Sequence, residues 1–207
     1  MDNVKEIRLV PLTADDREQF IRDNQEAFIY GATEEIFEQR GQSQACLDYA
    51  ESRKNSGKAQ FGMRDNHFEE EGEIISRDTI EQSIDGENAE AYRIMLGDKK
   101  VGGVVISVTE GKGDLELLFV SPKAHSKGIG YKAWCEVERL HPEVKVWETV
   151  TPYFETRNIH FYVNRCGFHI VEFYNSHHPD PNDHERMEDD NDGMFRFQKI
   201  IPSSDEQ

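Results

Sequence analysis

Residues 115–133 read LELLFVSPKAHSKGIGYKA. The apolar run 115–120 is typical of a buried strand, and a serine-proline pair ends it. Gly128 and Gly130 follow in a short basic turn, and residues 131–140 have the composition of a helix. The stretch therefore predicts a strand, a tight turn and a helix in direct succession.

The turn between this strand and this helix has the features of an anion site. Backbone N–H groups and the positive end of the helix dipole meet there, and the two glycines permit φ > 0 and a close approach by a ligand. The chain has 41 acidic residues and a net charge of −17, yet no acid lies between Glu116 and Glu136. That interval holds basic residues instead: Lys123, His125, Lys127 and Lys132. A phosphate ligand would explain this segregation, and an ordinary strand–helix connection is the alternative.

Two common phosphate motifs do not fit the turn. The P-loop string G-x-x-x-x-G-K-[ST] is absent from the chain, and the strict dinucleotide fingerprint would need glycine at Ala133. The segment from Val120 to Gly130, VSPKAHSKGIG, instead resembles the pyrophosphate loop [R/Q]-x-x-G-x-[G/A] of the GNAT superfamily of acyl-CoA-dependent N-acetyltransferases. His125 stands where that family usually has Arg or Gln.

A second segment supports the resemblance. Residues 158–168, NIHFYVNRCGF, look like the family block N-x-x-A-x-x-x-Y-E-K-x-G-F. By that spacing the family tyrosine falls on Val163, one residue after Tyr162, and the asparagine falls on Thr156 instead of Asn158. Either the helix is locally displaced, or the usual acid is absent.

The resemblance, which is best over residues 90–175, implies a fold and a ligand. The fold would be α+β, a single GNAT-like domain over 1–207, with a central mixed, mostly antiparallel sheet flanked by helices and with splayed central strands. Acetyl-CoA would be the co-substrate. Its implied contacts follow the strand, the turn and the second motif: Leu118, Phe119, Val120, His125, Ser126, Lys127, Gly128, Ile129, Gly130, Tyr131, Asn158 and Tyr162.

The resemblance also implies direct attack of an amine on the acetyl group in a ternary complex. A base is needed, because a protonated amine has no lone pair. Alternation along the strand predicts that the side chains at even positions from 114 to 120 share one face. Asp114 and Glu116 are base candidates on this strand, and Glu148 is a candidate on the neighbouring one. Glu116 ranks first because apolar residues surround it. The alternatives are that Asp114 belongs to a turn, that Glu148 is a solvated strand residue, and that none of the three is the base. Tyr162 is the candidate acid for the leaving thiolate, with core packing as the alternative.

The rest of the chain alternates helices and strands, without an internal repeat or a second domain. Thr13 is expected to cap the first helix. Hydrophobic periodicity and turn residues predict strands at 4–10, 92–96, 101–108, 144–150, 168–174 and 194–201, and helices at 15–30, 34–50, 78–84 and 155–166.

Composition limits the function classes. The net charge of −17 argues against a nucleic-acid partner. No apolar stretch reaches spanning length and no signal-peptide pattern is present, so no membrane partner is expected. Three cysteines without a C-x-x-C pair are expected to be free thiols of a cytoplasmic protein, either a monomer or a homodimer.

The segment 175–193 is an acidic surface loop with three His and two Asp within 177–184. The spacing of these ligands matches no closed site, so no metal is expected. The acids of the loop predict a field that favours a cationic amine acceptor, and the alternative is that they only keep the protein soluble. The alternative function is a non-catalytic acyl-CoA-binding or sensing domain on the same fold.

Overall fold

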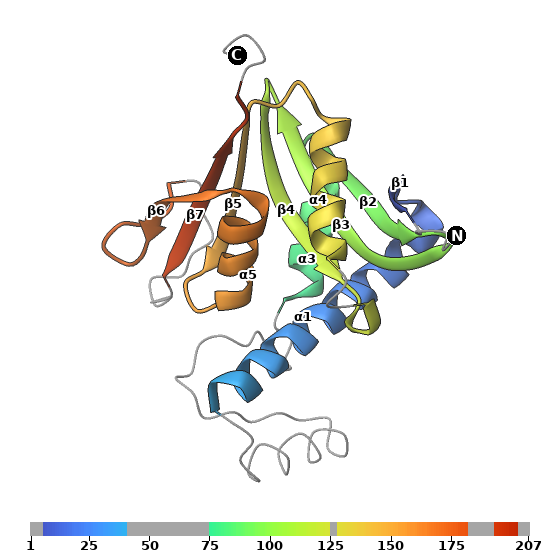
Figure 1. Cartoon of the computed structure of the whole chain (residues 1–207), viewed down its shortest axis with the longest axis horizontal. Helices are drawn as coiled ribbons and strands as arrows, with labels where there is room; N and C mark the ends of the chain where they lie inside the picture. Colours follow the sequence, from blue (N-terminus) through green and yellow to red (C-terminus); the bar gives the residue numbers. More distant parts are fainter. Residues whose placement is uncertain (1–5, 41–74, 125–127, 182–192, 203–207) are drawn as a thin grey trace.

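One mixed sheet of seven strands organises the chain, in the order β1-β2-β3-β4-β5-β7-β6. The computed structural model describes residues 6–40, 75–124, 128–181 and 193–202. Neighbouring strands are antiparallel except β4 and β5, which are parallel. The strands are β1 (Ile7–Pro11), β2 (Ala89–Leu96), β3 (Lys99–Thr109), β4 (Lys112–Val120), β5 (Val146–Pro152), β6 (His169–Tyr174) and β7 (Met194–Ile200). The expected α+β class with a mixed, mostly antiparallel sheet is confirmed (Figure 1).

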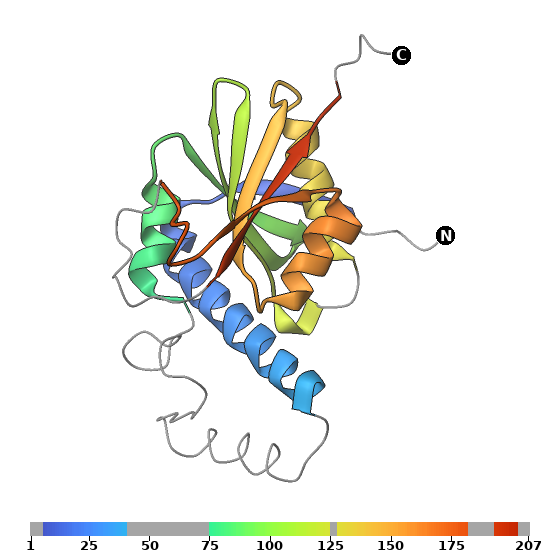
Figure 2. The ribbon, with the colours of Figure 1, turned by 90° about the vertical axis from the view of Figure 1, so that its left-hand side faces the viewer.

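Helices cover both faces of this sheet. Figure 2 shows α1 (Arg17–Arg40) and α3 (Arg77–Asp85) on one side, and α4 (Ile129–Leu140) and α5 (Thr156–His160) on the other. The α4 side holds the larger core, in which Trp134 packs edge-to-face on Trp147 with ring centroids 5.2 Å apart. The α1 side holds a smaller core: Phe20, Ile21, Ala27, Ile80, Val105, Leu117 and Phe119.

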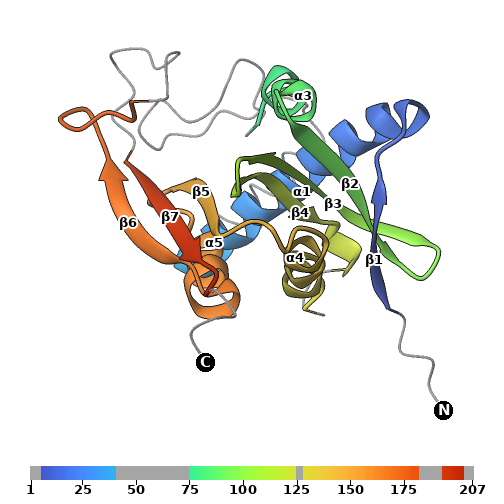
Figure 3. The same cartoon turned by 90° about the horizontal axis from the view of Figure 1, so that it is seen from above.

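The two parallel strands separate almost at once. β4 and β5 pair only over Lys112–Asp114 and Val146–Glu148, after which β4 stays with β3 and β5 stays with β7. Figure 3 shows the result from above as two diverging halves of the sheet. The expected splayed central strands are therefore present: β4 and β5 diverge beyond Asp114 and Glu148, and a gap opens between them.

A β-bulge in β4 corrects the expected alternation of its side chains. Val105 of β3 pairs with Leu117, but the next residue, Ile106, pairs with Leu115, so Glu116 is the extra residue. Leu118 and Val120 consequently pack into the core on the α4 side, while Leu117 and Phe119 pack on the α1 side. The prediction that positions 114 to 120 alternate without interruption was wrong.

The first helix also differs from the expectation. It continues to Arg40 instead of breaking near residue 31, and the remainder of the helix expected at 34–50 lies outside the described residues. Thr13 makes no side-chain cap, because a 3₁₀ turn at Ala14–Asp16 begins the helix. Among the described residues, no helix is both long and apolar enough to cross a membrane.

A buried arginine holds α1 on the sheet. The Arg93 side chain of β2 is 3% exposed and donates to the carboxylates of Asp16 and Asp23, each at 2.7 Å. Its guanidinium also lies 5.0 Å from the ring centroid of Phe20. Moving the helix away would leave the buried Arg93 charge without its partners, which is energetically costly. The cluster therefore holds α1 in its position over the sheet.

Asn24 gives a stability prediction for the same interface. Its side chain is fully buried on α1, and within the described part of the chain neither its amide nitrogen nor its oxygen has a hydrogen-bond partner. Replacing it with leucine, which has a similar branched shape, should raise the free energy of unfolding by about 1 kcal/mol or more, because the desolvation cost of an unpaired amide disappears. Urea denaturation measures this, with Asn24→Asp as the destabilised control; a less stable Asn24→Leu protein would contradict the reading.

Candidate active site

A pocket of about 540 Å³ lies at the end of β4, on the side of the gap between β4 and β5 where α4 and α5 begin. Its walls come from the end of β4, the first turn of α4, the helix α5 with the segment that follows it, and α1. The lining residues are Ala27, Phe28, Leu118, Phe119, Val120, Ala124, Gly128, Ile129, Gly130, Tyr131, Glu155, Arg157, Asn158, His160, Phe161 and Arg165.

The start of α4 has the geometry expected of an anion site. Gly128 precedes the helix in the left-handed region, with φ 65° and ψ 21°. A Cβ placed on Gly128 would meet no atom of the described residues within 4 Å, so these residues leave space above the helix N-terminus. A Cβ on Gly130 would lie 3.4 Å from the ring of Phe161, which closes the opposite wall. The first turn of the helix, with the backbone N–H groups that have no partner within it, therefore lies on the pocket wall.

Most of the residues expected to bind the co-substrate lie together in this pocket. Those on its wall are Leu118, Phe119, Val120, Gly128, Ile129, Gly130, Tyr131 and Asn158. The residues His125, Ser126 and Lys127 lie outside the described residues. Tyr162 is not on the pocket wall, and its position needs a separate description.

Tyr162 occupies a π-helical segment, Phe161–Cys166, that continues α5. The N–H of Gly167 donates to the carbonyl of Tyr162, five residues earlier, and Gly167 has φ 80° as expected for a C-terminal glycine. A π turn contains one residue more than an α turn. The one-residue offset of Tyr162 in the sequence motif thus coincides with a local displacement of the helix.

The Tyr162 side chain points into the core at the place where β4 and β5 separate. It is 8% exposed and packs on Phe168 and Phe197, at centroid distances of 5.8 and 5.4 Å. Burial raises the pKa of Tyr162 to about 12, against the opposing effect of a hydrogen bond with Thr149. The Thr149 hydroxyl in turn donates to the carbonyl of Leu115 at 2.9 Å. A protonated phenol therefore lies beside Leu115 and Thr149, the first residues at which β4 and β5 no longer pair with each other.

Two carboxylates, Asp114 and Glu116, lie on the α1 side of β4, opposite the face that packs on α4. Desolvation raises the pKa of Glu116, with a smaller contribution from Asp114, while a hydrogen bond from the Ser107 hydroxyl at 3.2 Å opposes the shift. Desolvation also raises the pKa of Asp114, and the nearby Glu148 adds to the effect. Both side chains are nevertheless exposed on this face of the sheet, so the raised pKa values make them better proton acceptors than a carboxylate of ordinary pKa without burying either group.

Glu148, the third base candidate, is engaged in ion pairs. Arg196 donates to its two oxygens at 3.2 and 2.9 Å, and Gln198 donates at 2.9 Å. The Arg196 guanidinium lowers the pKa of Glu148 and also pairs with Glu172 at 2.9 Å. A carboxylate held in this way is a weak base, which argues against Glu148 as the catalytic base. Its two hydrogen bonds instead hold Arg196 of β7 against β5.

Comparison with known proteins identifies the family. The family model described as the acetyltransferase (GNAT) family matches residues 59–168. The chain belongs to this family. A protein of Bacillus subtilis (strain 168) named "Uncharacterized protein YrkN" is 45% identical over 144 residues, which are 66% of this chain and 78% of that protein.

Solved GNAT structures have the same fold. The ribosomal-protein-S18-alanine N-acetyltransferase of Escherichia coli superposes with a TM-score of 0.57 at 13% identity, covering 97% of each chain. The PaiA N-acetyltransferase of Thermoplasma acidophilum, in complex with coenzyme A, gives a TM-score of 0.55 at 13% identity, covering 95% of this chain and 99% of that one. These likenesses show a GNAT fold, and family membership makes the chain an acyltransferase.

Sequence reasoning missed one wall of this GNAT pocket. Arg157, Phe161 and Arg165 follow one another at intervals of four residues and all face the cavity. That spacing marks one face of a helix and was the available signal. Ala27 and Phe28 of α1 come from a distant part of the sequence, and no local pattern could place them there.

The His and Asp residues of the acidic loop do not gather in the described part of the chain. Described residues 6–40, 75–124, 128–181 and 193–202 include no group of three His, Cys, Asp or Glu arranged to hold a metal ion. His178 instead contacts Glu172, with its Nε2 2.8 Å from the carboxylate. Asp183 and His184 lie outside the described residues.

Gly128 provides a direct test of the pocket. Gly128→Val should lower CoA affinity by at least about 100-fold, because a branched side chain would occupy the open space over the helix N-terminus and disfavour the left-handed backbone. Calorimetric titration measures the affinity, and circular dichroism checks folding. Gly86→Val, remote from the pocket, is the matched control. A folded Gly128→Val protein with unchanged affinity would show that the ligand does not reach this turn.

Proposed function

We propose that this GNAT-family protein transfers an acetyl group from acetyl-CoA to an amine by direct attack in a ternary complex. The observation that carries the proposal is the separation of β4 and β5 beside a pocket that ends at the open N-terminus of α4. CoA-bound structures of the same fold support acetyl-CoA as the co-substrate, including that of a Bacillus subtilis acetyltransferase with a TM-score of 0.51. The left-handed Gly128, which leaves room for a phosphate, fits such a ligand.

The pocket residues divide the binding of acetyl-CoA between them. The N–H groups from Gly128 to Tyr131 would bind the diphosphate, and His125, Ser126 and Lys127 would extend this turn. The backbone of Leu118, Phe119 and Val120 would hold the pantetheine as an added strand, and Asn158 would hold it from the facing helix. When bound, the thioester supplies the activated acetyl group.

We assign the proton transfers to Glu116 and Tyr162. Glu116 would take the proton of the incoming ammonium, and its raised pKa suits this role. Asp114, on the same side of β4, would relay the proton or help to bind the ammonium. Tyr162 stays protonated at neutral pH and would donate to the departing sulfur. A backbone N–H near Phe119 or Val120 would polarise the acetyl carbonyl.

We further propose a cationic acceptor. On the face of the sheet that carries Glu116, Lys112 and Arg196 pair with Glu148 and Glu172, while Asp114 and Glu116 add two further carboxylates. An excess of negative charge near the base attracts an ammonium and repels a carboxylate. The acidic loop would add to this field, although residues 182–192 lie outside the described part of the chain.

An acetyl-transfer assay tests the function. Purified protein with acetyl-CoA should release free thiol when amines are added, and di- and polyamines should be better acceptors than amino acids. Raising the salt concentration should lower kcat/KM for the polyamines, because exposed charges are screened over about 10 Å at 0.1 M ionic strength. Tight acetyl-CoA binding without stimulation by any amine would favour the non-catalytic binding domain instead.

The assigned base makes a prediction about pH. Glu116→Gln should lower the rate by about 100-fold at pH 7 and recover at a pH above the pKa of the acceptor, where free amine is abundant. In the unmodified protein the rate should fall as the pH drops through the raised pKa of Glu116, because only the deprotonated carboxylate accepts a proton.

Two further variants complete this test. Tyr162→Phe should lower kcat while leaving acetyl-CoA affinity within about twofold, since the phenol acts only on the leaving group. Asp114→Asn should change the rate less than Glu116→Gln does. A Glu116→Gln protein with the normal rate at every pH would refute the assignment of the base.

A further inference from the structure

The helical wall of the pocket is basic in an otherwise acidic protein. The chain carries a net charge of −17, yet α5 and the π-helical segment bring two arginines, Arg157 and Arg165, to the cavity. Among the described residues that line the pocket, Glu155 is the only carboxylate. A concentration of positive charge on this wall indicates contact with an anionic part of the ligand, in addition to the anion site at the start of α4.

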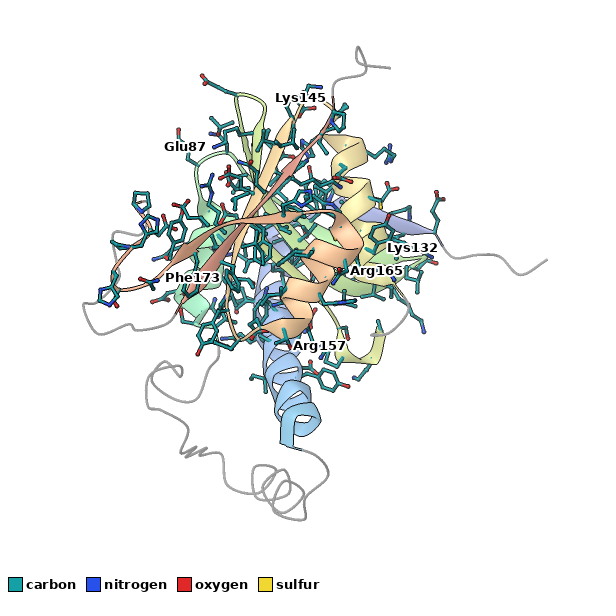
Figure 4. The ribbon with its side chains drawn as sticks, turned by 60° about the vertical axis from the view of Figure 1, so that its left-hand side comes forward. Glu87, Lys132, Lys145, Arg157, Arg165 and Phe173 are labelled. Atoms are coloured by element: carbon teal, nitrogen blue, oxygen red, sulfur yellow. The ribbon has the colours of Figure 1, made fainter. Side chains whose placement is uncertain are left out.

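Arg165 contacts an aromatic residue on the α4 side of the pocket. Its guanidinium carbon lies 5.4 Å from the ring centroid of Tyr131, on the first turn of α4. Both residues line the pocket, and Tyr131 is 38% exposed, so the contact lies at the open rim. Figure 4 shows Arg165 extending from its helix toward α4, with Arg157 at the beginning of the same helix.

The stacking fixes how Arg165 can bind a ligand. A guanidinium that lies over an aromatic ring uses its face for that contact and keeps its N–H edges for an anion. Phosphate accepts two parallel N–H bonds from such an edge, which is the strongest form of this contact. A guanidinium held over Tyr131 in this way leaves an N–H edge available to a phosphate at the rim.

The position of Arg165 and Tyr131 at the rim indicates which phosphate of the co-substrate Arg165 would contact. This step rests on the proposed function, in which the diphosphate lies at Gly128 and the pantetheine runs inward along β4. The adenosine part of CoA then lies at the rim, where it carries one more phosphate on its ribose 3′-oxygen. We infer that Arg165, held by Tyr131, binds the ribose 3′-phosphate and makes the site select CoA over dephospho-CoA.

Calorimetric titration with CoA and with dephospho-CoA tests this inference without any acceptor. The unmodified protein should bind CoA about 10- to 100-fold more tightly, the range expected for a charge-assisted phosphate contact. Arg165→Gln should reduce this ratio to about threefold or less by weakening CoA alone, with dephospho-CoA affinity within about twofold of normal. Tyr131→Leu should also reduce the ratio, whereas Tyr131→Phe, which keeps the ring, should preserve it.

Two control variants make the assignment specific to Arg165. Arg139→Gln, on the exposed end of α4 where Arg139 pairs with Glu136, should leave both affinities unchanged. Arg157→Gln should leave the ratio of the two affinities near normal, even if both become weaker. Equal weakening of CoA and dephospho-CoA by Arg165→Gln would show a merely structural role, and loss of the ratio in Arg157→Gln instead would move the contact to Arg157; either result overturns the inference. An unmodified protein that binds both ligands equally also overturns it, while one that binds neither would refute the proposed function itself.

Discussion

The early end of the β4–β5 ladder is the constraint on which the rest of the structure depends. Three residue pairs join the two parallel strands, and beyond them the strand pairing within the described residues is of β4 with β3 and of β5 with β7. Backbone N–H and C=O groups near a core need hydrogen-bond partners. At Leu115 the side chain of Thr149 supplies one, by donating to the carbonyl that follows the last ladder pair. Beyond that point the gap widens into the pocket, where an extended ligand can take the place of the missing strand.

The gap also brings together groups from the two faces of the sheet. The phenol of Tyr162 approaches it from the α4 side, because the π-helical segment turns that side chain into the core. The bulge at Glu116 leaves Asp114 and Glu116 on the α1 side, while Leu118 and Val120 line the pocket side. The proposed acid and the proposed base lie on opposite faces of one opening, which suits a reaction in which the acyl donor enters from one side and the acceptor from the other. The two distortions from regular geometry, the bulge and the π turn, thus both occur beside the proposed reaction centre.

The parts of the site that sequence could predict are those set by local chemistry. The strand-turn-helix unit and the left-handed Gly128 follow from neighbouring residues, and the structure has both. The bulge at Glu116 depends on the register with β3, so simple alternation gave the wrong faces. The π turn was visible only as a motif out of register by one residue. Ala27 and Phe28 could not be found, because their place at the pocket depends on how α1 packs over β4 through the buried pairs of Arg93.

Amide hydrogen exchange with and without acetyl-CoA measures most directly whether the gap receives a strand-like ligand. The account predicts slower exchange confined to the pocket edge of β4, at 118–120, and to the first turn of α4, at 128–131. The paired segment 112–114, which already belongs to the ladder, should be unaffected. Binding that leaves the exchange at 118–120 and 128–131 unchanged, or that slows it only elsewhere in the chain, would contradict the account.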